Sequence, residues 1–274
     1  MSKVLSPAQI EGFWKNGYVA PIRAISTERA ASIRSKLETF EKSTGGPLSG
    51  SFRGRSHLLF TWLNELIREE KIVDAIEDLY GENILCWASS FFIKEAEDPS
   101  FVSWHQDSTY WGLSSPDVVT AWVALSESNK ANGALEVVPG THLQDQIPHR
   151  DTFSKDNMLT RGQEVAVEVD PKSAVMLELE PGEMSLHHVR LIHGSAPNPS
   201  RRRRIGFAIR YMPTSVRQLE GDDSASLVRG VDTYATFEHE PIPSRDMDPV
   251  AVEFDRKQHE RSTKILYRDA KIPA

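Results

Sequence analysis

Residues 203–212 read Arg-Arg-Ile-Gly-Phe-Ala-Ile-Arg-Tyr-Met, and the alternation within them indicates the fold class. Successive residues of a β-strand point to opposite faces of a sheet. The large apolar side chains at alternate positions from Ile205 to Tyr211 therefore share one face. Arg204, Arg210 and the small residues between them share the other face. This pattern predicts a strand that packs against a core on one side and lines a pocket on the other.

Other short segments of the chain show the same β character. They are separated by turn dipeptides such as Pro139-Gly140 and Pro181-Gly182. The expected strands are 83–94, 118–125, 134–138, 164–169, 174–179, 184–188 and 203–212. Many short strands with this punctuation indicate a β-sandwich or barrel.

Helices are expected before and after the strands. Ser6-Pro7-Ala8-Gln9 is a capping box with proline at the first helical position. Apolar spacing predicts further helices over 27–40, 59–69, 72–80 and 249–266, and a Gly- and Ser-rich loop over 42–55. We expect a single domain over 1–274. It has a helical N-terminal part at about 1–81, a barrel at about 82–213, and C-terminal loops with a late helix at 214–274.

The amino-acid composition argues against several classes of function. The 274 residues include 32 basic and 39 acidic side chains, which gives a formal net charge of −7. Global attraction to nucleic acid or to an acidic membrane is therefore not expected. The one cysteine, Cys86, lies in an apolar run and cannot form an intramolecular disulfide. No apolar stretch follows the N-terminal charge, so we expect no signal peptide and a reducing, cytoplasmic setting.

The local motif with the most chemical content is Trp104-His105-Gln106-Asp107. In an extended segment His105 and Asp107 project to the same side, so both can bind one metal ion. A third ligand would complete two histidines and a carboxylate on one face of the metal, which suits non-heme Fe(II) oxygenases. The motif alone is weak, because an ordinary hydrogen-bonded pair at a strand end has the same sequence.

A second motif lies downstream, where His193 ends an apolar run directly before Gly194. Glycine lets the backbone bend close to a ligand. Eleven residues later, Arg204 begins the strand described above. An arginine followed by small residues suits the floor of a pocket, where a guanidinium can bind a carboxylate through two hydrogen bonds.

Taken together, the motifs resemble the phytanoyl-CoA dioxygenase family of Fe(II)/2-oxoglutarate oxygenases over residues 5–214. They are Leu5-Ser6-Pro7-Ala8-Gln9-Ile10 with Gly17-Tyr18-Val19, Trp104-His105-Gln106-Asp107, Thr120-Ala121-Trp122-Val123-Ala124-Leu125, Asn132-Gly133-Ala134-Leu135, Pro139-Gly140-Thr141-His142, His193-Gly194-Ser195 and Arg204. The resemblance implies a mainly β fold with flanking α-helices, namely the double-stranded β-helix, a jelly-roll or cupin-like barrel. It also implies use of Fe(II), 2-oxoglutarate and O2.

Roles follow from the same resemblance, position by position. It implies iron ligands at His105, Asp107 and His193. It implies that Arg204 binds the distal carboxylate of 2-oxoglutarate with help from Ser195, and that Trp122 lines the cosubstrate site. The resemblance places the stretch from Asn132 to His142 in a structural hairpin and turn.

The related non-heme iron halogenases share similar segments but have a small residue at the position of Asp107. Because this chain keeps the carboxylate there, the resemblance implies hydroxylation or another oxidation of a C–H bond, with release of succinate and CO2, rather than chlorination. A small molecule of specialised metabolism is the expected substrate class.

Substrate contacts are less determined by sequence. The candidates are Lys94, Tyr110, Trp111, His188 and Arg210. The pocket is expected from loops at about 43–57, 108–117, 143–163 and 213–245. Adjacent strand residues face opposite ways, so at most one of His187 and His188 can share the pocket. His142 and His149 are interpreted as turn and surface residues.

Two other readings stay open at the level of sequence. Two histidines and a carboxylate also suit a zinc hydrolase, although such an enzyme has no use for Arg204 and Ser195 at this spacing. A barrel that binds a small molecule without chemistry is the other reading, and the intact set of polar residues counts against it. Neither nucleic acid nor membrane is an expected partner, and the oligomeric state is not determined.

Overall fold

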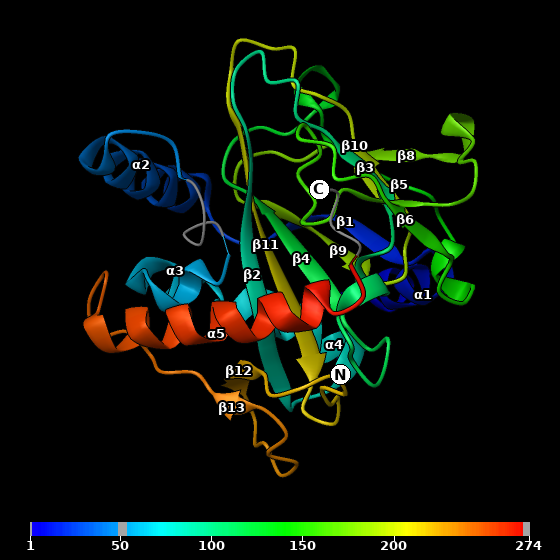
Figure 1. Cartoon of the computed structure of the whole chain (residues 1–274). Coiled ribbons are helices and arrows are strands. Elements are labelled where there is room, and N and C mark those ends of the chain that lie inside the picture. The colour runs from blue at the N-terminus through cyan, green and yellow to red at the C-terminus, as the bar shows by residue number, and fades with distance from the viewer. Residues whose placement is uncertain (1, 49–53, 271–274) are drawn as a thin grey trace.

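The computed structural model describes residues 2–48 and 54–270, which form facing β-sheets with helices outside them (Figure 1). In this part of the chain the larger sheet has the strand order β1-β9-β4-β11-β2-β12-β13. Its strands are β1 (Tyr18–Arg23), β2 (Ile84–Lys94), β4 (Val119–Ala124), β9 (Glu183–His188), β11 (Arg204–Pro213), β12 (Ser224–Arg229) and β13 (Glu238–His239).

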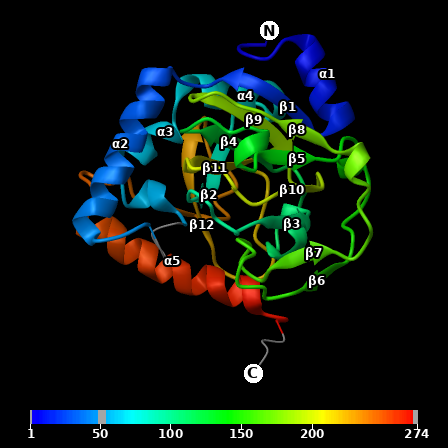
Figure 2. The same cartoon turned by 90° about the horizontal axis from the view of Figure 1, so that it is seen from above.

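The smaller sheet has the order β3-β10-β5-β8, and a separate pair of strands, β6 and β7, lies beside it. These strands are β3 (Val102–His105), β5 (Leu135–Val137), β6 (His149–Asp151), β7 (Gln163–Val165), β8 (Val175–Leu177) and β10 (His193–Ser195). Seen from above, the two sheets face each other across the middle of the molecule (Figure 2). The two-sheet architecture predicted from the strand pattern is thus present.

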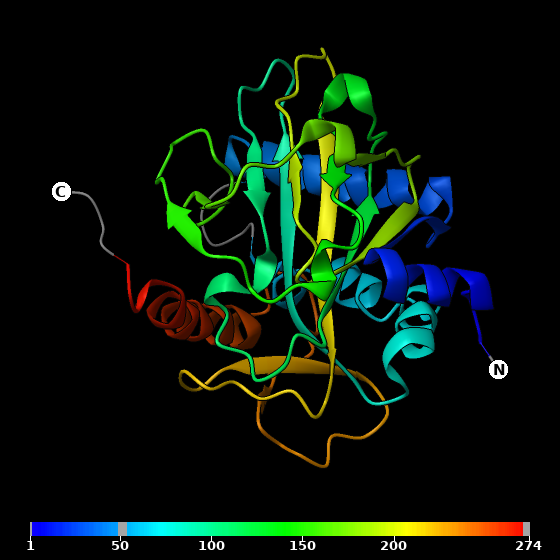
Figure 3. The same cartoon turned by 90° about the vertical axis from the view of Figure 1, so that its right-hand side faces the viewer.

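Five α-helices are described. The second to the fourth lie outside the larger sheet, and the first and the last lie on opposite sides of the molecule (Figures 1, 2 and 3). In chain order the helices are α1 (Pro7–Asn16), α2 (Thr27–Thr44), α3 (Thr61–Leu66), α4 (Glu70–Tyr80) and α5 (Pro249–Tyr267). The capping box predicted at Ser6 and Gln9 is formed, and Gly17 ends α1 at φ 85°. Within the described residues, no helix is long and apolar enough to cross a membrane.

The loop predicted from residue 42 starts later than expected, because α2 continues to Thr44. Glu41 stabilises this last turn. Its carboxylate accepts a hydrogen bond from Leu48 N at 2.9 Å and pairs with the guanidinium of Arg203 at 2.9 Å. The loop prediction also covers residues 49–53, which lie outside the described residues.

β11 confirms the two faces predicted for residues 203–212. Ile205, Phe207, Ile209 and Tyr211 are buried in the main core with residues of α3 and α4. The opposite face lines the space between the two sheets. There, a Cβ on Gly206 would lie 1.9 Å from Cζ2 of Trp122 on β4, so the glycine makes room for the indole.

β12 and β13 lie in a segment that the sequence pattern indicated as long loops. β12 pairs with β2, and Ser224, Ala225 and Ser226 are buried there. Both serine hydroxyls donate to the buried carboxylate of Glu240. Because polar partners replace an apolar face, hydrophobic alternation could not reveal this strand.

Candidate metal and cosubstrate site

The two site histidines meet through the pairing of β3 with β10. In that antiparallel register His193 lies directly opposite His105, although the residues are 88 positions apart. Asp107 follows β3 at the start of the short helix η3 (Asp107–Tyr110), and its N–H donates to Val189 O at 3.0 Å. The smaller sheet therefore brings together the three residues predicted as metal ligands.

The three side chains are buried, and each offers a ligand atom within 4.8 Å of the others. His105 Nε2 lies 3.2 Å from Asp107 Oδ1, and His193 Nε2 lies 3.9 Å from the same oxygen. Ligand bonds of about 2.0–2.2 Å at right angles would separate neighbouring ligand atoms by about 3 Å. The spacing thus suits one metal ion bound on one face.

In each site histidine, the hydrogen bond made by one ring nitrogen determines that the other nitrogen is available to bind a metal. His105 Nδ1 contacts Ser103 O at 2.9 Å and His193 O at 3.1 Å, and His193 Nδ1 contacts Leu191 O at 2.9 Å. Carbonyl oxygens only accept, so both Nδ1 atoms carry the proton. In the neutral rings both Nε2 lone pairs then face the Asp107 carboxylate, an arrangement that a metal cation satisfies.

Electrostatics support the same arrangement. Burial disfavours the charged form of Asp107, but the adjoining side chains of His105 and His193 and the guanidinium of Arg210 outweigh it and hold the pKa of the carboxyl well below its usual range. Burial and the neighbouring His105 lower the pKa of His193 well below that of a free histidine. An ionised carboxylate and a neutral imidazole are the protonation states that metals bind.

Arg204, the residue predicted to bind 2-oxoglutarate, lies on the same cavity. His105, Asp107, Trp122, His193, Ser195 and Arg204 all line it. Arg204 is 2% exposed, and its Nη1 donates to Gly133 O at 2.8 Å. Among the described residues its Nε has no hydrogen-bond partner, and burial lowers the pKa of the guanidinium to about 10.

A buried guanidinium without a carboxylate partner is costly, so an anion is expected beside it. Lys94 adds positive charge nearby, because its Nζ donates to Ser195 Oγ at 2.7 Å and also to Ala196 O. Burial and the charge of Arg204 lower the pKa of Lys94 to about 7. Lys94 is fully buried behind Ser195, where it positions that hydroxyl.

Several residues at the site were not identified from sequence as contributors. Gly133, interpreted as part of a structural turn, supplies the carbonyl that holds Arg204. His149, interpreted as a surface residue, is half-buried and accepts a hydrogen bond from Gln106 N at 2.9 Å, which fixes the backbone between two of the ligands. Both contacts use backbone atoms, so no side-chain motif could reveal them. His142, likewise expected at the surface, is buried, and its Nε2 contacts Trp14 O at 3.0 Å.

The side chains of His187 and His188 point to opposite faces of β9, as expected for neighbouring residues of a strand. His187 lines the metal cavity, and its ring centroid lies 4.8 Å from that of His193. His188 points to the other face of β9, where its ring packs against Phe13 and His142. The geometry therefore does not bring His188, a predicted substrate contact, to the site, and His187 takes its place.

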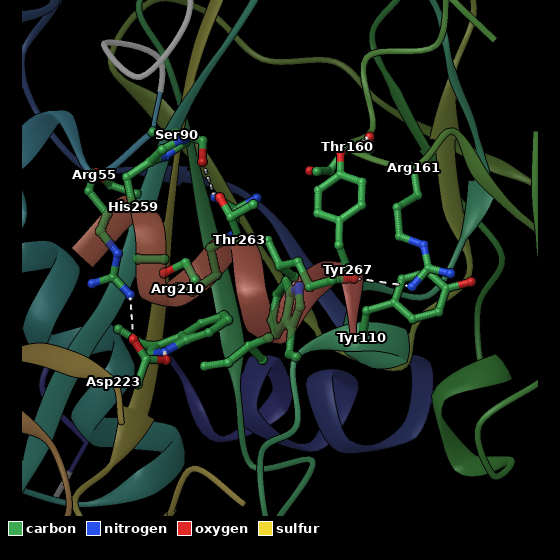
Figure 4. Close-up of a pocket in the computed structure, with 18 of the residues that line it drawn as sticks. Arg55, Ser90, Tyr110, Thr160, Arg161, Arg210, Asp223, His259, Thr263 and Tyr267 are labelled. Carbon is green, nitrogen blue, oxygen red and sulfur yellow. Dashed lines mark hydrogen bonds and ion pairs between the residues drawn. The ribbon is translucent and has the colours of Figure 1, made fainter. Parts of the chain in front are cut away.

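A larger cavity of about 790 Å³ adjoins the metal cavity, and Arg210 lines both (Figure 4). Tyr110 and Trp111, two of the predicted substrate contacts, line the larger one. The four loops expected to form the pocket contribute Gly54, Tyr110, Phe153, Arg161 and Asp223, among others. The sequence interpretation missed one whole wall, which α5 supplies.

The comparisons with known proteins agree with this geometry. The family model "Phytanoyl-CoA dioxygenase (PhyH)" matches residues 2–206. A "Probable alpha-ketoglutarate-dependent hypophosphite dioxygenase" of Stutzerimonas stutzeri is 32% identical over 197 residues, which cover 70% of this chain and 68% of that protein.

Two solved structures extend the likeness to most of the chain. The non-heme monooxygenase ThoJ, in its apo form, is 31% identical with a TM-score of 0.85, and the match covers 95% of this chain and 98% of that one. CytC3 with Fe(II) and alpha-ketoglutarate is 25% identical with a TM-score of 0.67, over 89% of this chain and 96% of that one.

These likenesses confirm the expected double-stranded β-helix fold, although the sheets of this chain do not close into a continuous barrel. The two histidines and the carboxylate that such enzymes require converge in this structure. The chain therefore belongs to the phytanoyl-CoA dioxygenase family, a family of Fe(II)/2-oxoglutarate-dependent oxygenases.

Proposed function

We propose that His105, Asp107 and His193 hold Fe(II) in this chain, and that 2-oxoglutarate and O2 complete the site. The observation that carries the proposal is the convergence of two imidazole Nε2 atoms on one carboxylate, with both Nδ1 atoms bonded to backbone carbonyls. When bound, iron and 2-oxoglutarate supply an oxidative decarboxylation that yields succinate, CO2 and an oxidant for a C–H bond.

The protein's part is positioning. Arg204 would bind the distal carboxylate of 2-oxoglutarate, with the Ser195 hydroxyl beside it. Lys94 holds that hydroxyl in place through its hydrogen bond at 2.7 Å. Trp122 packs along the space between Arg204 and the metal ligands, where it would exclude water from the cosubstrate.

Asp107 favours oxygenation over chlorination. Its carboxylate occupies the coordination position that a halide would need, and its lowered pKa keeps it ionised near neutral pH. We therefore propose that the product is hydroxylated or otherwise oxidised, without incorporation of chloride.

We propose that the larger cavity receives the substrate, a small molecule of specialised metabolism. Tyr110, Trp111 and Arg210 would contact it. Arg210 marks the passage to the metal, since it lines both cavities. We also propose that residues 1–274 act as a single oxygenase domain in a reducing, cytoplasmic setting, in keeping with one buried cysteine.

The test is a screen for succinate release by the purified full-length chain with Fe(II), 2-oxoglutarate, O2 and a panel of small molecules. We expect at least one compound to raise succinate formation, with one oxidised product formed per succinate. Replacement of Fe(II) by Zn(II) should abolish this turnover. Consumption of a panel compound with Zn(II), in the absence of 2-oxoglutarate and without succinate formation, would favour a hydrolase and contradict the proposal.

A further inference from the structure

One wall of the larger cavity is a face of α5. Asp255, His259, Ser262 and Thr263 line the cavity and recur at the spacing that places residues on one side of a helix. All four are polar or ionisable. His259 and Thr263 are labelled in Figure 4. The family model matches residues 2–206, so α5 lies beyond the matched residues.

Three hydrogen bonds hold α5 against the cavity. Tyr267 OH donates to Thr160 O at 2.8 Å, and Arg161 Nη1 donates to Leu266 O at 3.1 Å. Nearer the start of the helix, Gln258 donates to the carboxylate of Asp223, which also lines the cavity. The polar face of α5 is therefore a fixed part of the wall.

Most charges on this cavity are neutralised within the protein. Arg161 pairs with Asp151. Arg55 pairs with Asp223 at 3.0 Å and with Glu240 (Figure 4). Asp223 further accepts hydrogen bonds from the side chains of Trp87 and Gln218, and Glu240 accepts them from two serines.

Asp255 is the exception among the acids. It is 6% exposed, yet within residues 2–48 and 54–270 its carboxylate makes neither a hydrogen bond nor an ion pair. Burial, with the nearby charge of Glu240, raises its pKa to about 7, and Arg55 opposes this only in part. A carboxylate that lines a cavity without a partner is available to a ligand.

The charges around Asp255 favour a cation. Three carboxylates, those of Asp223, Glu240 and Asp255, lie near the guanidinium of Arg55, and the imidazole of His57 contacts Glu240 at 2.8 Å. Counted with both of these basic groups, the carboxylates are still in excess. At Arg210, where the larger cavity meets the metal cavity, the local charge is positive. Arg210 there donates to Ser90 Oγ at 2.9 Å and has no carboxylate within ion-pair distance among the described residues.

We propose that the larger cavity binds a substrate that carries an amine or guanidine group, and that Asp255 of α5 pairs with this group. The positive charge of Arg210 keeps the cationic end of the substrate away from the metal, so the oxidised carbon lies remote from it. Trp111 and Tyr267 line the same cavity and offer aromatic faces to a cation, whereas Tyr110 already stacks with the guanidinium of Arg161 at 3.7 Å. The inference rests on the proposed function, because it assigns the substrate of the same site.

The test compares cationic probes with neutral partners of similar shape. The pairs are N-acetyl-lysine amide with N-acetyl-norleucine amide, N-acetyl-arginine amide with N-acetyl-citrulline amide, and phenethylamine with phenethyl alcohol. Binding to the full-length chain, loaded anaerobically with Fe(II) and 2-oxoglutarate, is measured by isothermal titration calorimetry. The variants are Asp255→Asn and, as a control, Glu260→Gln, which removes a charge from an exposed position of the same helix.

We expect the cationic member of at least one pair to bind about tenfold or more tightly than its neutral partner, as truncation of buried charge pairs indicates. Asp255→Asn should remove this preference and Glu260→Gln should retain it. The inference is overturned if every pair lacks a charge preference, including by absence of binding, or if Asp255→Asn keeps the preference. It is also overturned if the neutral members bind more tightly.

Failure of the proposed function gives a different result. The charge-transfer absorption of the Fe(II)–2-oxoglutarate complex is recorded in each protein before the titration. If the band is absent from the wild-type chain, the proposed function fails. If the band is present in the wild type and in Asp255→Asn while the probes show no charge preference, only the inference about Asp255 fails.

Discussion

The two cavities that meet at Arg210 are built in different ways. The metal cavity is lined by side chains from strands whose register is fixed by backbone pairing, such as His105 opposite His193. The larger cavity also has strand residues in its lining, such as Ser90 of β2 and Arg210 of β11, but its other walls are loops and α5, a helix held by a few side-chain hydrogen bonds. Backbone pairing thus sets the geometry of the metal cavity, whereas the position of α5 in the larger cavity depends on side-chain contacts.

The residues of the two cavities are also distributed differently along the sequence. Every residue proposed to bind iron or 2-oxoglutarate precedes residue 206, where the family match ends, whereas Arg210 and α5 follow it. The residues proposed to bind iron and 2-oxoglutarate thus lie within the family match, whereas the larger cavity combines residues within that match, such as Tyr110 and Trp111, with residues beyond it. Four predictions test this comparison, in order of decreasing expected effect.

Loss of a metal ligand should have the largest effect. Alanine at His105, Asp107 or His193 removes one of three ligand atoms, and we expect it to reduce iron binding and succinate formation by more than the roughly 10–100-fold caused by loss of an outer-shell partner. Metal content after anaerobic loading and turnover would both be measured. His239→Ala, at an exposed histidine on β13, is the control. Full turnover of Asp107→Ala without added halide would contradict the assignment.

Arg204→Met should separate cosubstrate binding from iron binding. Truncation of one partner of a buried charge pair costs about 2–5 kcal/mol, so the Kd of 2-oxoglutarate should rise about thirtyfold or more. Iron affinity should remain near that of the wild type, because Arg204 does not contact a ligand residue in the structure. An unchanged Kd for 2-oxoglutarate would show that the anion binds elsewhere.

Gly206→Ala tests how closely the inner face of the larger sheet is packed. The new Cβ would lie 1.9 Å from Trp122, so the indole must move, and overpacking of this kind typically costs about 1–3 kcal/mol. Urea denaturation should show this loss, together with weaker binding of 2-oxoglutarate. The control is Gly12→Ala in α1, where nothing lies within 4 Å of the added methyl group and stability should be retained or increased.

Asp255→Asn should have the smallest effect on iron and 2-oxoglutarate binding, and its effect on stability should depend on pH. Because folding raises the pKa of Asp255 from 3.8 to about 7, the folded state binds more protons between these values and loses stability as pH rises through them. The variant should therefore gain stability relative to the wild type between pH 4 and 7, and the gain should level off above pH 7.

The groups that face Asp255 are Arg55, Asp223, Glu240, Arg210 and His259, and all remain in the variant. Denaturation midpoints at several pH values, with Glu260→Gln as the control, would measure the gain. A difference between Asp255→Asn and wild type that stays constant over this range would show that Asp255 does not titrate as the structure indicates.

The residues of the metal cavity could be predicted from the sequence because short-range patterns along the chain indicate them. Spacing of two residues set His105 and Asp107 on one side, and alternation along 203–212 separated the core-facing from the cavity-facing residues of β11, as the structure confirms. The sequence did not predict the contacts that depend on backbone atoms or on long-range packing. The carbonyl of Gly133, the support from His149 and the buried serines of β12 left no pattern in the side chains.

The C-terminal helix shows the same limit. Its bounds were predicted within one residue, since 249–266 was expected and Pro249–Tyr267 is observed. Its place beside the cavity depends on Gln258, Arg161 and Tyr267 finding partners about 35 to 107 residues away. Which face of a helix meets a cavity is set by such distant contacts, so the role of Asp255 emerged only from the structure.

The most direct measurement of the central claim is an anaerobic titration of the full-length chain with Fe(II) and 2-oxoglutarate, followed by visible absorption. We expect a weak metal-to-ligand charge-transfer band in the wild type, no band in His193→Ala, and a band in Arg204→Met only at much higher 2-oxoglutarate. A wild-type chain that binds Fe(II) yet shows no band at saturating 2-oxoglutarate would contradict the account.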